Sequence, residues 1–228
     1  YNKKGNSMIL KVKNLVKNYY KDNEKIEAVN NISYNFEKGK FYAIMGPSGS
    51  GKSTFLHLIG TLDTYDEGSV FINNIDVSSL DDLQLSKIRK EEIGFVFQSF
   101  YLNNNMKAYE NVIMPIMLDK IPYKDKKEKG ITILNSLGLE KRVNHYPSEL
   151  SKGECQRVAI ARALINNPNI ILADEPTGNL DSKNERNIFE LLKKLSFEGK
   201  CVIVVSHNEE IKKYADVVLK IRDGKLYE

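Results

Sequence analysis

Tryptophan is absent from the 228-residue sequence, which also contains only two cysteines, three histidines and six prolines. Cys155 and Cys201 lie far apart and have neither metal-ligand spacing nor the density of a disulfide-stabilised scaffold. We therefore expect both to be packed, reduced thiols. No apolar run approaches the roughly 18 residues that a membrane-spanning helix needs. The opening segment YNKKGNSM lacks the apolar centre of a signal peptide, so we expect the chain to stay in the cytoplasm.

The charge of the chain is modest. Charged residues make up 28% of the sequence and the formal net charge is +4, which suits a globular protein with weak attraction for anions. The lysine-rich stretch YKDKKEKG (123–130) carries both signs and is interpreted as a solvated surface. We therefore expect no nucleic-acid partner.

Short apolar runs alternate with helical patterns, a rhythm typical of a parallel α/β sheet. The runs FYAIMG, IGFVFQ, NIILADE, CVIVVSH and DVVLKI are predicted to be strands that are buried on both faces. ILKVKNLVKNYY and AVNNISYNFEKGK, continued by GSVFINNIDV, instead predict half-exposed antiparallel strands. Between about Phe100 and Leu150 the pattern is mainly helical, with breaks at prolines.

These patterns predict one domain, residues 8–228, in the α/β class. It combines an α/β core with a small antiparallel β lobe and an inserted α-helical lobe. Residues 1–7 are interpreted either as a short natural N-terminal extension or as a remnant of expression, in which case Met8 would be the first natural residue. The predicted parts are a β lobe at about 8–40 and 65–78, a core at about 41–64, 93–98 and 155–228, and a helical lobe at about 99–154.

The stretch GPSGSGKST fits the pattern G-x-x-x-x-G-K-[ST], and it follows a predicted strand and precedes a predicted helix. Its glycines allow successive N–H groups to point at phosphate oxygens. Lys52 is predicted to reach the β- and γ-phosphates, and the Ser53 hydroxyl to bind Mg²⁺. The alternative is a glycine-rich turn without a ligand. The candidate nucleotide-binding residues are Gly46, Pro47, Ser48, Gly49, Ser50, Gly51, Lys52, Ser53 and Thr54.

Two acidic residues end the run NIILADEP. Asp174 is predicted to orient the coordination shell of Mg²⁺, as a nucleoside triphosphatase requires. Glu175 is placed to activate the attacking water as a general base. Alone, such a pair is often an ordinary strand-end cap, but a phosphate loop in the same chain favours the catalytic interpretation.

The segment LSKGE (150–154) opens another predicted helix. Ser151 and Glu154 have the spacing of an S-x-x-E capping box. That interpretation gives Gly153 no role, and it leaves exposed backbone donors of the kind that bind anions at a helix N-terminus.

Taken together, these motifs resemble the ATP-binding subunit of an ABC transporter, over essentially the whole chain from Met8. The further matching elements are Gln98 after GFVF, NLD at 179–181 and His207 in VVSHN. The resemblance implies a P-loop ATPase core of the ABC type, with ATP and Mg²⁺ as its cofactors. One departure is Lys152, where the family usually has glycine.

The resemblance also implies roles for individual residues. Ser151, Gly153 and Glu154 would grip the γ-phosphate of ATP bound to a second copy of the chain, so that two copies enclose two ATP molecules. Gln98 would touch Mg²⁺ or the attacking water, and His207 would contact the γ-phosphate and position the water or Glu175. The remaining implied roles are stacking of Tyr19 on adenine and coupling of the two sites by Asp181, with His57 and His145 left as structural.

The implied activity is ATP hydrolysis that drives a separate membrane permease subunit, with this chain bound peripherally at the cytoplasmic face of the membrane. ENVIMPIML and ADEPTGNLDS resemble the subgroup for lipoprotein release and for macrolide or antimicrobial-peptide export. An importer of small solutes such as amino acids is the alternative. A soluble ABC protein that acts on ribosomes or DNA, and a P-loop kinase or GTPase, fit the sequence less well.

Overall fold

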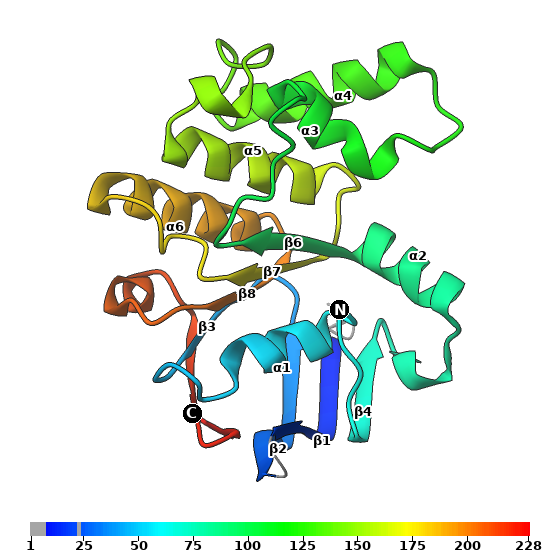
Figure 1. Cartoon of the computed structure of the whole chain (residues 1–228), viewed down its shortest axis with the longest axis vertical. Helices are drawn as coiled ribbons and strands as arrows, with labels where there is room; N and C mark the ends of the chain where they lie inside the picture. Colours follow the sequence, from blue (N-terminus) through cyan, green and yellow to red (C-terminus); the bar gives the residue numbers. More distant parts are fainter. Residues whose placement is uncertain (1–7, 22–23) are drawn as a thin grey trace, which may run out of the picture.

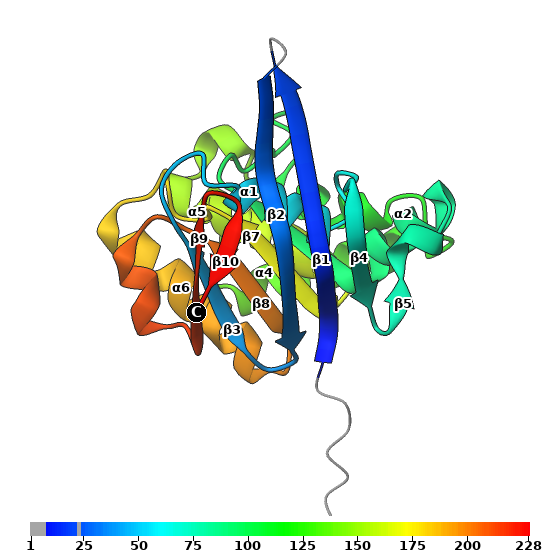
Figure 2. The ribbon, with the colours of Figure 1, turned by 90° about the horizontal axis from the view of Figure 1, so that it is seen from below.

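An antiparallel sheet built around a long two-stranded ribbon forms one side of the protein (Figure 2). The computed structural model describes residues 8–21 and 24–228. The strand order in this sheet is β2-β1-β4-β5. Asn73 and Asn74 have φ angles of 50° and 64° and join β4 to β5, a backbone typical of a two-residue hairpin turn. The bounds are β1 Met8–Lys21, β2 Glu24–Glu37, β4 Glu67–Ile72 and β5 Ile75–Asp76.

A second sheet has the order β10-β9-β3-β8-β7-β6, and only β10 runs antiparallel to its neighbour. The five apolar runs predicted as strands all lie in it, so their prediction as strands of a parallel sheet is confirmed. The bounds are β3 Phe41–Met45, β6 Ile93–Phe97, β7 Ile170–Asp174, β8 Cys201–Val205, β9 Val217–Arg222 and β10 Lys225–Tyr227.

Burial on both faces was wrong for β9. Leu219 and Ile221 are buried, but Lys220 between them is exposed. The strand lies near the edge of the sheet, between β3 and the antiparallel β10. Leu219 and Ile221 pack in the core that the two sheets share, whereas on the other face only the partly buried Val218 packs against the core on that side of the sheet. The face of β9 that carries Lys220 is therefore buried only in part, which gives the strand a partly alternating burial pattern.

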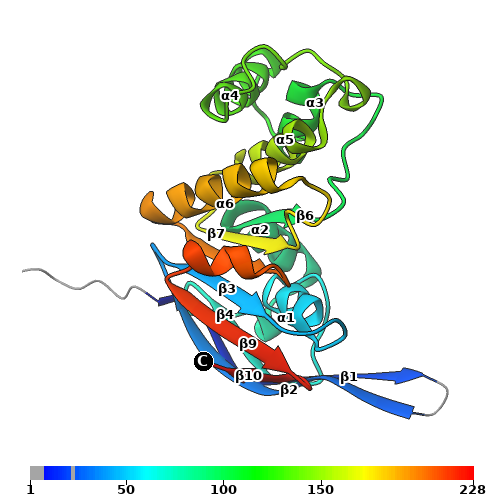
Figure 3. The same cartoon turned by 90° about the vertical axis from the view of Figure 1, so that its left-hand side faces the viewer.

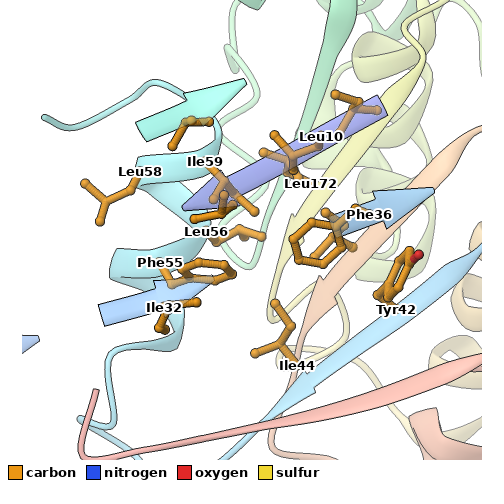
Figure 4. Packing of buried hydrophobic residues seen from close by; sticks show 14 of the residues in the cluster. Leu10, Ile32, Phe36, Tyr42, Ile44, Phe55, Leu56, Leu58, Ile59 and Leu172 are labelled. Carbon is orange, nitrogen blue, oxygen red and sulfur yellow. The ribbon is translucent and has the colours of Figure 1, made fainter. Parts of the chain in front are cut away.

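Helix α1 (Lys52–Ile59) lies between the two sheets and fills the core that they share (Figures 1 and 4). Phe55 and Leu56 from α1 meet Phe36 from β2 and Ile44 from β3 there, all almost completely buried. On the other face of the six-stranded sheet, helix α6 (Ser182–Phe197) buries Phe189 and Leu192 against β3 and β8 (Figure 3). The six-stranded sheet is thus covered on both faces, which explains its continuous apolar runs.

The helical lobe lies at the far end of the molecule from the antiparallel sheet (Figures 1 and 3). Its third core packs α3 and α4 against Val158, Ala161 and Ile165, which lie on or just after α5. The predicted boundary between lobe and core at 154/155 falls inside α5. The bounds are α3 Ala108–Ile113, η2 Met114–Ile116, α4 Tyr123–Ser136, η3 Pro147–Glu149 and α5 Lys152–Leu164.

Helix α2 (Asp82–Glu92) follows the short turn η1 (Val77–Ser79) and leads into β6, in a stretch that the predicted division assigned to no part. The turn η4 (Glu209–Lys213) follows β8. The predicted fold class, an α/β core with an antiparallel β lobe and a helical lobe, is confirmed. Cys155 and Cys201 are buried free thiols, as expected. Within the described ranges, no helix has the length and apolarity required to cross a membrane.

Candidate functional site

Four of the parallel strands end at a cleft of about 970 Å³. The strands β3, β6, β7 and β8 run in the same direction, so the residues that follow their carboxyl ends converge at one edge of the sheet. Such an edge is where open α/β sheets bind ligands. The cleft is lined by Tyr19, Lys25, Ile26, Glu27, Ala28, Ser48, Gly49, Gly51, Lys52, Ser53, Thr54, Gln98, Glu175, His207, Asp223 and Gly224.

The loop between β3 and α1 requires glycine at specific positions. Gly51, the residue before α1, has φ of 99°, and a Cβ there would lie 1.9 Å from the carbonyl oxygen of Ala28. Gly46 has φ of 154°, and a Cβ would lie 2.1 Å from the carbonyl oxygen of Ile221. Side chains larger than hydrogen are therefore excluded at both positions, and the backbone is free to curl as the glycine pattern predicts.

Lys52, the first residue of α1, is largely buried, and its ammonium donates to the carbonyl oxygens of Gly46 at 2.9 Å and Pro47 at 2.8 Å. The cation is therefore held inside the loop where phosphate oxygens are expected. Carbonyl dipoles compensate a buried cation less well than anionic oxygens do. A phosphate group in the loop would replace weaker partners with stronger ones.

Ser53 donates a 2.9 Å hydrogen bond from its Oγ to Oδ1 of Asp174 at the end of β7. Burial raises the pKa of Asp174 and outweighs the lowering effects of the Ser53 bond and of His57. A carboxylate that is costly to bury would gain from a divalent cation beside it, and a hydroxyl with a carboxylate suits Mg²⁺. His57, interpreted as structural, lies with Nε2 3.8 Å from Oδ2 of Asp174, because one turn of α1 separates it from Ser53.

Glu175 and His207 form a direct pair. Nδ1 of His207 lies 2.9 Å from Oε1 of Glu175, and the backbone N–H of His207 and the hydroxyl of Ser206 donate to Oε2 at 3.4 Å. Glu175 has a φ of 46°, which is uncommon for a residue other than glycine. Such conformations persist where the surroundings hold them and are frequent at active sites. Glu175 thus presents an oriented carboxylate to the cleft.

Gln98 lies directly after β6 and lines the cleft, as its position in the sequence suggested. Its carbonyl accepts a 3.0 Å hydrogen bond from the amide of Asn179. A Cβ at Gly178 would lie 2.6 Å from Nε2 of Gln98, so Gly178 leaves room for this side chain.

Tyr19, rather than Tyr20, lines the cleft, in agreement with the preference for Tyr19. Its hydroxyl lies 2.7 Å from Oδ2 of Asp63, and the ammonium of Lys17 lies 5.1 Å from its ring centroid. Burial and the Asp63 bond raise the pKa of Tyr19. Tyr19 is 40% exposed and lines the cleft, which leaves surface of the residue available for a ligand. Asp63 and Lys17 were missed because they meet Tyr19 only in the folded chain.

The capping box at the start of α5 is confirmed. Oγ of Ser151 accepts from the N–H of Glu154 at 3.3 Å, and Oε2 of Glu154 accepts from the N–H of Ser151 at 2.8 Å. Gly153 has a reason that the sequence did not give: a Cβ there would lie 2.4 Å from Oδ1 of Asn184 on α6. Asp181 caps α6 and accepts from the backbone and side-chain amides of Asn184.

These four residues, Ser151, Gly153, Glu154 and Asp181, do not line the cleft that holds the phosphate loop. Ser151 and Lys152 are exposed at the start of α5. Within the described chain, the structure therefore gathers Tyr19, Lys52, Ser53, Gln98, Glu175 and His207 at one cleft and leaves the LSKGE segment as a separate surface. The roles assigned to all of these residues stay predictions.

Gln156, in the second turn of α5, is a further residue that sequence reasoning missed. Its side chain is completely buried, and Nε2 donates to the carbonyl oxygens of Pro176 at 2.7 Å and Phe97 at 3.4 Å. Those two carbonyls belong to the neighbours of Glu175 and Gln98. A glutamine in the polar start of a helix carries no signal for such contacts.

Comparisons with known proteins agree with this geometry. The sequence profile of the family described as ABC transporter matches residues 29–178. An ABC transporter ATP-binding protein of Methanocaldococcus jannaschii, MJ0796, is 47% identical over 96% of this chain and 95% of its own length. The macrolide export ATP-binding/permease protein MacB of Bdellovibrio bacteriovorus is 46% identical over 95% of this chain, which spans about a third (33%) of that protein.

Solved structures are similar over nearly the whole chain. A dimeric structure of the MJ0796 cassette has a TM-score of 0.89 at 45% identity, covering 96% of this chain and 97% of that one. A dimeric post-hydrolysis state of MJ0796 bound to ADP and Pi has a TM-score of 0.88, with the same identity and coverage.

Proposed function

The chain belongs to the ABC transporter family as an ATP-binding cassette, and on that premise we propose that two copies bind and hydrolyse Mg-ATP to drive a separate membrane permease. One observation carries the proposal: the Ser53–Asp174 and Glu175–His207 pairs meet at the ends of adjacent strands, β7 and β8, beside the phosphate loop. This arrangement supplies a metal position and a base position around the place where a γ-phosphate would lie.

In this proposal, Tyr19 stacks on the adenine base and the loop from Gly46 to Thr54 holds the phosphates. The exposed face of the Tyr19 ring suits a flat base, which stacking recognises with little selectivity between purines. Lys52 exchanges its two carbonyl partners for phosphate oxygens. Mg²⁺ would be held by Ser53, Asp174 and Gln98, and it would supply positive charge beside the phosphates.

Glu175 is the proposed general base. Its carboxylate is oriented by His207 and Ser206, and one of its oxygens can accept a proton from water. His207 is proposed to donate a hydrogen bond either to the carboxylate of Glu175, which it thereby holds in place, or to an oxygen of the γ-phosphate. Binding, orientation and proton transfer are thus assigned to different side chains of the cleft.

The second copy supplies what one chain lacks at its cleft. Ser151, Lys152 and the N-terminal amides of α5 form an exposed anion-binding surface away from the phosphate loop of the same chain. Docking this surface of one copy on the nucleotide of the other, around a two-fold axis, would complete two identical sites. Lys152, in place of the usual glycine, adds positive charge there.

The permease is proposed to dock beside Gln98. A hollow of about 400 Å³ between α2, β6 and the helical lobe is lined by residues that include Phe97, Tyr101, Met114 and Arg162. Next to it, Met117 and Leu118 are exposed, the latter at 98%. A permease segment in this hollow would hold the chain at the cytoplasmic face of the membrane. Similarity to MJ0796 and MacB supports an export, lipoprotein-release or macrolide-resistance system of the same subgroup.

The test is the Glu175→Gln variant. The amide keeps the shape but cannot take a proton, so ATP should stay bound and hold two copies together, because a ligand bound by both stabilises the dimer by mass action. Light scattering after chromatography should show a monomer without nucleotide and a dimer with Mg-ATP. Glu190→Gln, an exposed site on α6, is the control and should behave as wild type. A Glu175→Gln variant that hydrolyses ATP at the wild-type rate would contradict the proposed base.

A further inference from the structure

Two loops of the candidate site are anchored by the same buried side chain. Gln156 is 0% exposed, and its amide Nε2 lies within hydrogen-bond distance of two carbonyl oxygens, 2.7 Å from that of Pro176 and 3.4 Å from that of Phe97. Pro176 directly follows Glu175, and Phe97 directly precedes Gln98. A buried amide that donates to two backbone segments fixes their separation, because breaking either bond would leave a buried N–H group without an acceptor.

The turn after Glu175 needs such support. With φ of 46°, Glu175 has a backbone conformation that is costly for a side chain of its type. From the β8 side, the N–H of Glu175 is held by the carbonyl of Val205 at 2.9 Å. From the α5 side, Gln156 donates to the carbonyl of Pro176, the residue after Glu175. The carboxylate of Glu175 is therefore placed by contacts on both sides of the turn.

Gln156 also lies three residues after Gly153 on α5 and five residues after Ser151, the N-cap of that helix. Its amide thus joins the surface proposed to grip the partner's nucleotide to the loops that carry Glu175 and Gln98 in its own chain. Because α5 is a continuous helix from Lys152 to Leu164, a shift at its first turn moves Gln156 with it.

We propose that Gln156 is a positioning residue that couples the LSKGE surface to Glu175 and Gln98 of the same chain. This inference rests on the proposed ATP-sandwich dimer. In that dimer, nucleotide at one site presses on the first turn of α5, and Gln156 carries the displacement to the base of the other site. Gln156 itself touches neither nucleotide nor water.

The experiment replaces Gln156 by leucine in the full chain, which keeps the volume and removes both hydrogen bonds. Hydrolysis at saturating Mg-ATP should fall by at least roughly tenfold, since small displacements of a reacting group have large effects on rate. Nucleotide affinity of the monomer should stay within about twofold, because the phosphate loop is untouched. If the nucleotide affinity of Gln156→Leu falls by the same factor as its hydrolysis rate, the inference is overturned.

Asn111→Leu is the matched control. Asn111 is also completely buried, and its amide donates to three carbonyls of the helical lobe, away from the cleft. This variant should lose comparable thermal stability but retain its hydrolysis rate. If Gln156→Leu is as active as Asn111→Leu, Gln156 is only structural. If the wild-type chain does not hydrolyse ATP, that result would instead contradict the proposed function, and the inference that rests on it would fail as well.

Gln156→Glu gives a second readout if the leucine variant does not fold. A buried carboxyl has a raised pKa, and only its protonated form can donate to the carbonyl of Pro176. The hydrolysis rate of this variant relative to wild type should therefore rise as the pH falls from about 8 to about 6. A ratio that is constant over this range would overturn the donor role.

Discussion

Ser53 and Asp174 are 121 positions apart in the chain, and a 2.9 Å hydrogen bond joins Oγ of the first to Oδ1 of the second. The bond connects the first turn of α1 to the end of β7. It therefore fixes the phosphate loop against the strand that carries the acidic pair.

Asp174→Asn should separate metal binding from nucleotide binding. The amide can still accept the Ser53 bond, but it lacks the charge that attracts Mg²⁺, so hydrolysis should fall by roughly 10²-fold or more. Nucleotide affinity without Mg²⁺ should be unchanged, whereas the gain in affinity on adding Mg²⁺ should be lost. Fluorescent-nucleotide titrations with and without Mg²⁺ measure this. Asp125→Asn, exposed on α4, is the control, and an unaltered Mg²⁺ dependence in Asp174→Asn would rule out the metal role.

Lys52→Ala should abolish nucleotide binding at micromolar concentrations, because the phosphates lose their main cation. Calorimetric titration provides the measurement, and Lys141→Ala, an exposed site in the helical lobe, should bind normally. Retained affinity in Lys52→Ala would mean that the loop from Gly46 to Thr54 is not the nucleotide site.

Ser151→Arg should spare nucleotide binding by the monomer but block hydrolysis. The arginine places bulk on the exposed start of α5, where the partner's γ-phosphate is proposed to dock. It also removes the helix cap, which lowers stability by about 1 kcal/mol. Ser151→Ala, which removes the cap without adding bulk, separates the two effects and should hydrolyse faster than Ser151→Arg. Normal turnover in the arginine variant would remove the two-chain site from the proposal.

Glu154→Gln should make stability less sensitive to acid. Burial alone would raise the pKa of Glu154, but the bonds from Arg142 and Ser151 outweigh it and lower the pKa to about 2. A lowered carboxyl pKa contributes stability that is fully present above its ordinary value of 4.5 and is lost as the pH falls toward 2. Glutamine can keep the capping box but loses the ion pair with Arg142.

The free energy of unfolding should therefore be about 2 kcal/mol lower for Glu154→Gln than for wild type at neutral pH. The gap should narrow as the pH falls below 4.5. Denaturant titrations over that range measure it, and Glu140→Gln, exposed in the same lobe, serves as the control. A gap that does not change with pH would mean that the Arg142 pair contributes little.

The sequence predicted those features that depend on neighbours in the chain. The strand NIILADE, the glycines at 46, 49 and 51, and the S-x-x-E capping box are local patterns, and the folded chain retains each of them. Strand β9 was predicted as fully buried because its composition is apolar. Its position near the sheet edge, which composition does not encode, leaves Lys220 exposed.

Contacts between distant segments could not be predicted in the same way. Three contacts depend on the packing of separate elements. They are those of Asp63 with Tyr19, of Asn184 with Gly153, and of Gln156 with the loops after β6 and β7. These residues are polar and unremarkable in the sequence, and only their partners show what they do. His57 was set aside for the same reason, since nothing near it in the chain reveals Asp174.

The sharing of α5 between two cores limits how this protein can be recombined. Val158 and Ala161 complete the packing of the helical lobe, whereas Ile160, between them, belongs to the core beneath the six-stranded sheet. The helical lobe therefore has no boundary at which it could be exchanged without disturbing a hydrophobic core. In a chimera joined at residue 154, α5 would come from one relative and would have to pack against a helical lobe that came from another. Exchange of lobes between relatives should succeed only where α5 and its neighbours on both sides are inherited together.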